Sequence, residues 1–177
     1  MNPTDPGPIY IVHQTPVGRR ESNFIAQVDL TPFDLAGQFE QVWLHDQSDG
    51  TYALACIPFM AYGLALGDMV RLSPHGMVVD LVQVGGRRVL RLLMAEDPDT
   101  DRLARTVQEV KDCVARSGLL SEWHGSRFIA VDVPSGARPD AVYAVMETIV
   151  AEGRGHWEWA DVQTFVGVGT ATPEDAL

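Results

Sequence analysis

Two stretches with apolar residues at helical spacing, each lying between short β-rich runs, constrain the fold of this chain most strongly. Within residues 97–118, apolar side chains recur every three or four positions, and Gly118 stands where a helix would stop. Residues 138–153 repeat the pattern between Pro139 and Gly153, which are typical start and end residues of a helix. The sequence therefore predicts two amphipathic helices, each with one buried face.

Short runs of β-forming residues surround the two predicted helices. They occupy residues 87–94, 119–124, 127–133 and 157–162, and the Gly-Ser pair at 125–126 favours a hairpin. The resulting order β-α-β-β-α-β is that of a ferredoxin-like fold. In that topology both helices cover one face of the sheet and leave the other face for a partner.

The preceding half of the chain lacks a helical period and is rich in β-forming residues. Strands are predicted over residues 24–30, 39–47 and 51–59, and Asp49-Gly50 favours a tight turn between the last two. The pattern G-L-x-x-G-D-x-V that begins at Gly63 resembles the strand–turn–strand element of small β-barrels. This half is therefore predicted to be a small β-barrel-like unit.

Asp68 is the carboxylate of that pattern and has two interpretations. In the favoured one it accepts N–H bonds within the glycine turn, which is a common structural role of a short acidic side chain. In the other it acts as a general acid or base beside Tyr62. No companion group stands at catalytic spacing, so the structural role is preferred.

The Gly85-Gly86 pair lies between apolar runs at 77–84 and 87–94 and predicts a two-residue hairpin. Such a hairpin would place Val84 opposite Arg87, and Asp80 opposite Arg91 as a cross-strand ion pair. It would also bridge the two halves of the chain.

The expected organisation is an α+β protein with an N-terminal small β-barrel-like half and a C-terminal ferredoxin-like half. The predicted divisions are a flexible arm at 1–22 with one edge strand, the barrel-like half at 23–86, the ferredoxin-like half at 87–163 and a tail at 164–177.

Charge and composition exclude several classes of function. The chain has 13 basic and 24 acidic residues and a formal net charge of −11, so neither nucleic acid nor an anionic membrane is an expected partner. No apolar run approaches the roughly 18 residues of a membrane span, and the first residues do not form a signal peptide. Cys56 and Cys113 are far apart in sequence and match no metal or redox motif, so we expect a reduced, cytoplasmic protein.

Motifs that carry chemistry are absent from the sequence. There is no glycine-rich phosphate loop and no G-x-S-x-G elbow, and the five histidines show no metal-binding spacing. We therefore expect neither a cofactor nor a metal. His156 and Glu158 share one face of a predicted strand, and His124 ends another, so these three are the candidate titrating groups.

The tryptophans admit two interpretations. Trp157 and Trp159 share one strand face, and Trp123 lies near the end of another strand. Large aromatic side chains usually fill a core, which is the preferred interpretation. If they instead line the seam between the halves, they form an apolar cleft with polar groups at its rim. The candidate binding residues are then Tyr62, Arg91, Trp123, His124, His156, Trp157, Glu158 and Trp159.

Two functions follow. The first is a non-catalytic binding or accessory protein that recognises a peptide, a protein or a small molecule through the seam or an edge strand. The second is a small enzyme that uses His124, His156 and Glu158 in the seam, with Arg91 holding an anionic intermediate. Analogy with ferredoxin-like domains, which often pair through sheets or edges, adds a homodimer to the expectations. The absence of a catalytic constellation favours binding.

The stretch from Val42 to Val70 resembles the signature of a bacterial family of uncharacterised proteins, D-G-x-Y-x-L-x-x-I-P-F-x-A-x-G-L-x-x-G-D after a tryptophan strand. The resemblance extends over about residues 24–163. Cys56 departs from it, because a polar residue such as Asn is expected before Ile-Pro-Phe. The resemblance implies an α/β segment after the signature and carries no activity. The matching residues are Trp43, Asp49, Gly50, Tyr52, Leu54, Ile57, Pro58, Phe59, Ala61, Gly63, Leu64, Gly67 and Asp68.

Overall fold

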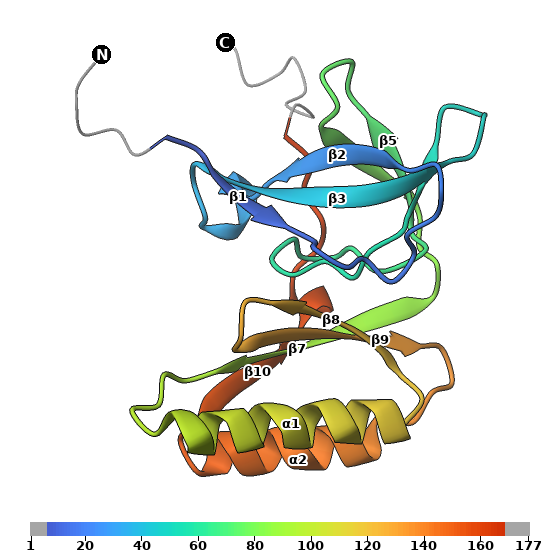
Figure 1. Cartoon of the computed structure of the whole chain (residues 1–177). Helices are drawn as coiled ribbons and strands as arrows, with labels where there is room; N and C mark the ends of the chain where they lie inside the picture. Colours follow the sequence, from blue (N-terminus) through green and yellow to red (C-terminus); the bar gives the residue numbers. More distant parts are fainter. Residues whose placement is uncertain (1–6, 169–177) are drawn as a thin grey trace.

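The computed structural model describes residues 7–168 and shows two stacked sheets, with two helices on the far side of the second sheet (Figure 1). The first sheet contains β1 (Ile9–Val12), β2 (Phe24–Asp29), β3 (Gln38–Asp46), β4 (Tyr52–Leu54), β5 (Met69–Leu72) and β6 (Val78–Gln83). The second sheet and its helices contain β7 (Arg87–Met94), α1 (Thr100–Arg116), β8 (Leu120–His124), β9 (Phe128–Pro134), α2 (Asp140–Ala151) and β10 (Gly155–Trp159). Short 3-10 turns lie at Thr31–Phe33 and Ala160–Val162. The chain is thus a mixed α+β protein.

The first sheet is curled but is not a closed barrel within the described residues. Its strands follow the order β1-β3-β4-β5-β6, and β2 pairs with β3 on the other side. The ends approach where β2 meets the start of β6, yet only the single bridge between Gln27 and Met77 joins them. β4 and β5 are short, and no continuous ladder closes the sheet round its core. The predicted barrel-like half is therefore an open, curled sheet.

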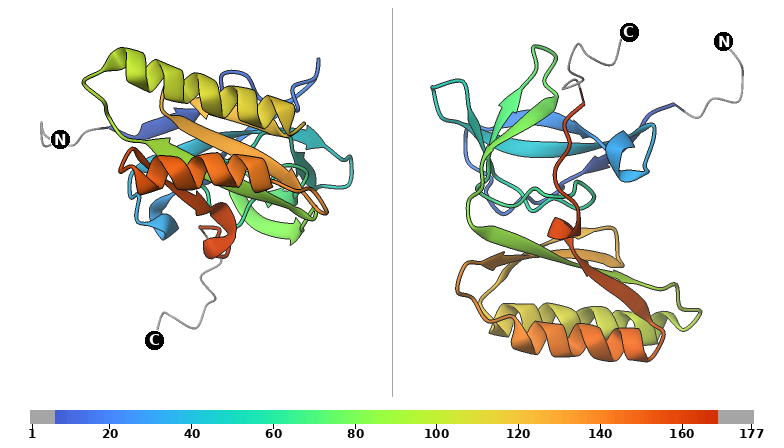
Figure 2. Two further views of the ribbon diagram at one scale, coloured as in Figure 1. Left: turned by 90° about the horizontal axis from the view of Figure 1, so that it is seen from below. Right: turned by 180° about the vertical axis from the view of Figure 1, so that it is seen from behind.

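The second sheet has the antiparallel order β10-β7-β9-β8, and both helices cover one of its faces (Figure 2). Both helices lie within the stretches predicted from apolar spacing. The side chain of Asp99 caps α1 by accepting a bond from the N–H of Arg102 at 2.9 Å. The apolar helix faces and the sheet enclose one core.

The predicted Gly85-Gly86 hairpin is wrong. β6 pairs with β5 in the first sheet, whereas β7 pairs with β9 and β10 in the second, so the glycines lie where the chain passes between sheets. Asp80 forms its ion pair with Arg71 at 2.6 Å instead of with Arg91. The local pattern of two apolar runs around Gly-Gly is the same whether the runs pair with each other or with strands elsewhere.

Parts of the predicted arm and tail are built into the fold. Residues 9–12 form β1, which lies parallel to β3, and His13 after it is buried. At the other end, residues 163–168 return from the second sheet to the first, and Phe165 packs against the first core (Figure 2). This return passes so close to Gly63 that a Cβ there would lie 2.2 Å from the Phe165 nitrogen. Residues 1–6 and 169–177 of the predicted arm and tail lie outside the described residues.

The two sheets meet at a seam where strand alternation separates two cores. On β7, Leu90 and Leu92 face the helices, whereas Val89 and Arg91 face the first sheet. The first core fills the curled sheet and reaches this seam through Phe128 and other side chains of the second sheet. The seam therefore holds both apolar residues and buried charges.

Candidate functional site: a buried polar network at the seam

Five charged or titratable side chains are almost fully buried where the two sheets meet. Arg91, Glu122 and Asp132 project from neighbouring strands of the second sheet, and their residues are 1%, 3% and 0% exposed. His13 and Glu40 face them from the first half of the chain and are 3% and 0% exposed. Buried charges are costly unless they are paired, so the partners of these groups decide what they do. Asp132 pairs with Arg87, whose Nε donates to it at 2.8 Å, whereas the other four groups form one network.

Glu40 projects inward from β3 and binds the loop that follows β4. Its carboxylate accepts the N–H groups of Phe59, Met60 and Ala61 at 2.5, 2.9 and 2.7 Å. The His13 Nε2 atom lies 3.0 Å from the same carboxylate. Three successive backbone donors thus converge on one buried anion, and this explains in physical terms why the I-P-F-x-A segment can take an irregular, largely buried path.

Glu122, on β8, binds the same loop from the other half of the chain. Its carboxylate accepts the N–H of Ile57 at 2.9 Å and that of Val17 at 3.0 Å, and the His13 Nδ1 atom lies 2.5 Å away. Glu122 and Glu40 together therefore hold the two ends of the I-P-F-x-A segment, residues 57–61. The network joins β8 of the second sheet to β3 and to the segment after β1.

His13 lies between the two carboxylates and is best described as an imidazolium. Each ring nitrogen faces a carboxylate oxygen, and a neutral ring would present a lone pair to one of them. Burial alone would lower the pKa of His13, but its interactions with Cys56, Glu122 and Glu40 outweigh burial and raise this pKa from 6.5 to about 12. The imidazolium thus offsets the charge of the buried carboxylates.

Glu40 stays ionised for the complementary reason. Burial opposes ionisation, but the bond and charge of His13, the charge of Arg91 and the N–H of Phe59 together lower the pKa of this carboxyl group. A buried carboxylate that accepts three N–H bonds and faces two cations is a structural anion.

Cys56 borders the network and is fully buried. Its Sγ accepts the N–H of Trp43 at 3.3 Å, and it interacts with His13. Burial raises the pKa of the thiol even though His13 acts in the opposite direction. A buried thiol with a raised pKa is a poor nucleophile, so the Cys56–His13 contact does not form a reactive dyad.

The network continues to the side of the seam through three residues that the sequence singled out. Arg91 donates to the Ala61 carbonyl, and its Nη1 lies 3.5 Å from Glu158. The Tyr62 hydroxyl donates to the Glu158 carboxylate at 2.9 Å, and the Arg91 guanidinium lies 4.9 Å from the centre of the Tyr62 ring. Tyr62, Arg91 and Glu158 therefore meet as the sequence-based interpretation of a seam requires.

The other candidate residues do not join them. Trp123, Trp157 and Trp159 pack on the core beneath the helices, on the sheet face opposite Glu158. The Trp157 indole N–H donates to Glu147 on α2, and Arg88 lies 3.9 Å from the centre of the Trp159 ring. The tryptophans thus belong to the core interpretation, and they do not line a cleft at the seam.

The two candidate histidines are held apart by the strand order. His124 ends β8 and His156 lies on β10, and these strands form opposite edges of the second sheet. The His124 ring lies 5.4 Å from the Phe59 ring, and His156 is exposed beside Leu93. Among residues 7–168 no group of three or more His, Cys, Asp and Glu side chains is arranged to hold a metal ion.

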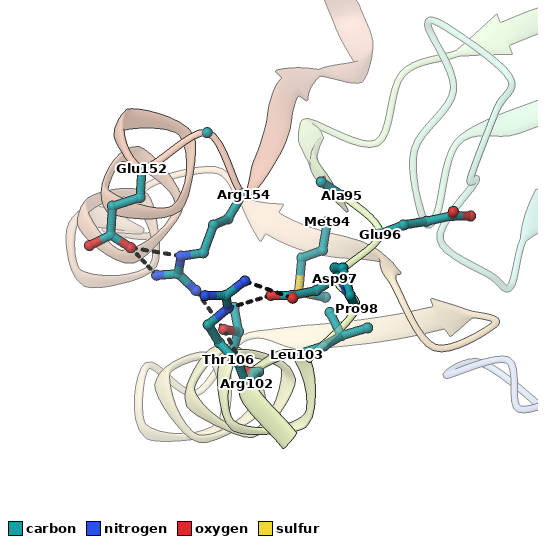
Figure 3. A pocket seen from close by; sticks show the side chains of 11 residues that line it. Met94, Ala95, Glu96, Asp97, Pro98, Arg102, Leu103, Thr106, Glu152 and Arg154 are labelled. Atoms are coloured by element: carbon teal, nitrogen blue, oxygen red, sulfur yellow. Dashed lines mark hydrogen bonds and ion pairs between the residues drawn. The ribbon is translucent and has the colours of Figure 1, made fainter. Parts of the chain in front are cut away.

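A cavity of about 450 Å³ lies away from the seam, between the start of α1 and the loop before β10 (Figure 3). Arg102 and Arg154 point into it, as the close-up shows. Arg102 makes two bonds to Asp97, at 2.5 and 2.7 Å, while Arg154 binds Glu152 and donates to Thr106 at 2.5 Å. Both guanidinium groups are thus neutralised by neighbouring carboxylates, which leaves the cavity without a net positive field for an anion.

Sequence reasoning missed His13, Glu40 and Glu122. Glu40 lies on the same face of β3 as the buried residues Val42 and Leu44, because side chains alternate between the two faces of a strand. This alternation alone places its carboxylate inside. His13 follows the apolar run Ile9–Val12 in a segment interpreted as an arm. No local signal indicates that these three side chains meet, because they are up to 109 positions apart in the chain.

Comparison with known proteins gives a family and one fold relative. A family model described as "Domain of unknown function (DUF4265)" matches residues 40–159. A search of curated proteins gives no significant match. The chain is similar to a solved structure titled as that of a hypothetical protein from Neisseria gonorrhoeae, with 14% identity and a TM-score of 0.59 over 81% of this chain and 98% of that one. At this identity the likeness concerns the fold alone.

Proposed function

The chain belongs to the family described as a domain of unknown function (DUF4265), and from this premise we propose that it is a non-catalytic binding or accessory protein of a bacterial cytoplasm. It recognises a protein or peptide partner through its surface. The observation that carries the proposal is that the acid–base groups of the seam already have partners within the fold. The net charge of −11 further supports a partner other than nucleic acid or an anionic membrane.

A catalytic acid or base needs a proton or lone pair that a substrate can reach. In the seam, both oxygens of Glu40 accept backbone N–H bonds and both nitrogens of His13 face carboxylates. These residues are at most 3% exposed. The network therefore supports the fold, and its groups are not offered to a ligand.

The enzymatic alternative has less support. It requires His124, His156 and Glu158 to act together, and the two histidines lie on opposite edges of the sheet. A small-molecule ligand is also less favoured, because the arginines of the cavity in Figure 3 are paired with Asp97 and Glu152.

The outer face of the first sheet offers a better surface. The register places Tyr10 beside Phe39 and Val12 beside Gln41. On the other side of β3, Ile25 lies beside Trp43, and strand alternation puts it on the same outer face, away from the buried Ile11. We call Tyr10, Val12, Ile25 and Phe39 the outer patch. Tyr10, Val12 and Ile25 are 50%, 37% and 45% exposed, and the Tyr10 and Phe39 rings stack with centres 5.8 Å apart. Exposed apolar and aromatic side chains on one sheet face are typical of protein-binding surfaces.

The second sheet supports the finer description of the fold. The order β-α-β-β-α-β, the sheet order β10-β7-β9-β8 and the position of both helices on one face together favour a ferredoxin-like half. Its free face is occupied by the first sheet, so the seam is not available to an external partner.

A photo-crosslinking amino acid placed at Ile25 tests the proposal in the native host. The matched control carries the same group at Val84, which is 66% exposed and lies outside the outer patch. We expect a discrete crosslinked species from position 25 and none from position 84. Equal, diffuse labelling from both positions, together with turnover that depends on His124 or His156, would replace the binding proposal with the enzymatic one.

A further inference from the structure

We propose that β1 pairs in antiparallel fashion with β1 of a second copy of this chain, so that two outer patches join into one surface. The proposal rests on the binding function proposed above and names a second copy of this chain as the partner of the β1 edge. It follows from three features of β1: the direction of its backbone groups, its lack of charge and the register that its sequence allows.

The first feature is the unpaired edge of β1. The N–H of Ile9 donates to the Gly37 carbonyl at 3.1 Å, so in a parallel ladder Ile9 and Ile11 direct their backbone groups toward β3. The N–H and C=O groups of Tyr10 and Val12 then point away from β3. No described strand pairs with this side of β1. Such an edge is a template for a further strand.

The second feature is the absence of exposed charge. Residues 7–18 contain no Asp, Glu, Lys or Arg, and His13 is buried. Natural edge strands that must stay single usually carry a charged side chain, a bulge or an internal proline, and β1 has none of these. In a chain of net charge −11, two copies repel each other wherever acidic surfaces meet. The β1 edge avoids that repulsion, and a second β1 is the partner that matches an uncharged apolar strand.

The third feature is the register. A two-fold axis at Ile11 places Tyr10 opposite Val12 of the second copy, and both residues direct their N–H and C=O groups into the new pair. Each of the two Tyr10–Val12 pairs can then exchange both backbone hydrogen bonds. A shift that centres the axis on Tyr10 would place Val12 opposite Pro8, which has no N–H to donate. The sequence thus favours an axis at Ile11 over one at Tyr10.

This pairing extends the outer patch across the two copies. The Tyr10 ring, which already stacks on Phe39, would lie beside Val12 of the second copy on the same sheet face. Ile11 of each copy faces inward, where it is already 5% exposed and part of the first core. The joined face would carry both outer patches and present roughly twice the apolar surface to a further partner.

Sedimentation velocity of the full chain at micromolar concentration tests the pairing. We expect a dimer for the wild type and a monomer for Val12→Pro, because proline removes an N–H that points away from β3 and is tolerated at a strand edge. Tyr10→Lys, which places a like charge beside the axis, should also be monomeric. The matched control Val84→Lys changes an exposed apolar residue elsewhere and should remain a dimer. Circular dichroism checks that each variant is folded. If Val12→Pro does not fold, Tyr10→Lys serves as the test of the pairing.

Disulfide trapping tests the register. In a hydrogen-bonded antiparallel pair the two Cα atoms are about 5.5 Å apart, which lies within the range that a disulfide spans. The double variant Tyr10→Cys with Val12→Cys should therefore form a covalent dimer on mild oxidation, while Val82→Cys with Val84→Cys should not. A wild-type monomer at all concentrations, or a dimer that both β1 variants leave intact, would overturn this inference. A crosslink from Ile25 to another protein would still support the binding function in that case.

Discussion

A protonated His13 makes the stability of this protein depend on pH in a direction that distinguishes it from an ordinary surface histidine. Its folded pKa of about 12 lies above the unfolded value of 6.5. The stability that it contributes is therefore fully present below about pH 6.5 and decreases as the pH rises toward the folded pKa. The seam thus loses support in mild base rather than in mild acid.

The magnitude follows from proton linkage. Above pH 6.5 the folded chain holds one proton at His13 that the unfolded chain releases, so the free energy of unfolding falls by about 1.4 kcal/mol per pH unit. Between about pH 7.0 and pH 8.5 the expected loss is about 2 kcal/mol. The Cys56 thiol, whose pKa burial raises from 9.0, adds to this slope only at higher pH, so the chosen interval isolates His13.

Urea denaturation at several pH values in this interval measures the slope. We expect His13→Gln to lose the slope, whatever its absolute stability, because no proton is taken up at this position on folding. His75→Gln changes an exposed histidine and should keep the wild-type slope. Equal slopes in the wild type and His13→Gln would show that His13 is neutral in the folded state, and the reasoning about the seam charges would be refuted.

Three further results are expected. Glu40→Gln should lower the free energy of unfolding by about 3 kcal/mol in urea titrations, because an amide NH₂ would replace an oxygen that accepts buried N–H groups. A loss below about 0.5 kcal/mol would contradict this role of Glu40. Gly63→Ala should lower the melting temperature more than Gly76→Ala. Both glycines have positive φ, but only at Gly63 would the new Cβ meet the Phe165 backbone. Equal shifts in melting temperature would argue against the close packing of residues 163–168. The buried thiols, including Cys56, should react with a thiol reagent no faster than the chain unfolds, and rapid labelling of the native protein would show that the seam opens.

The sequence predicted the elements of this fold better than their pairing. Both helices and the strands around them carry strong local signals, namely apolar spacing, Pro139 near a helix start and the Gly stops. The Gly85-Gly86 hairpin failed because a turn signal says nothing about which sheet the next strand joins, and here β6 and β7 lie in different sheets. Pairing is decided by long-range packing, which local patterns do not contain.

The site was predicted only in part for the same reason. Tyr62, Arg91 and Glu158 meet at the seam, but the centre of the network is formed by His13, Glu40 and Glu122, whose contacts cross most of the chain. A glutamate at an inward strand position was the one local clue, because such a residue must find donors when it is buried. The identity of those donors, three backbone N–H groups of an irregular loop, follows only from the folded structure.

Hydrogen exchange of the loop amides tests most directly whether the seam is a closed, structural network. The N–H groups of Phe59, Met60 and Ala61 donate to the buried Glu40 carboxylate. If the network supports the fold, these amides exchange only when the whole chain unfolds, and Glu40→Gln accelerates their exchange. If instead they exchange rapidly in the wild-type protein, the loop opens in the native state. The acid–base groups of the seam would then be accessible to a substrate, and the binding account would be contradicted.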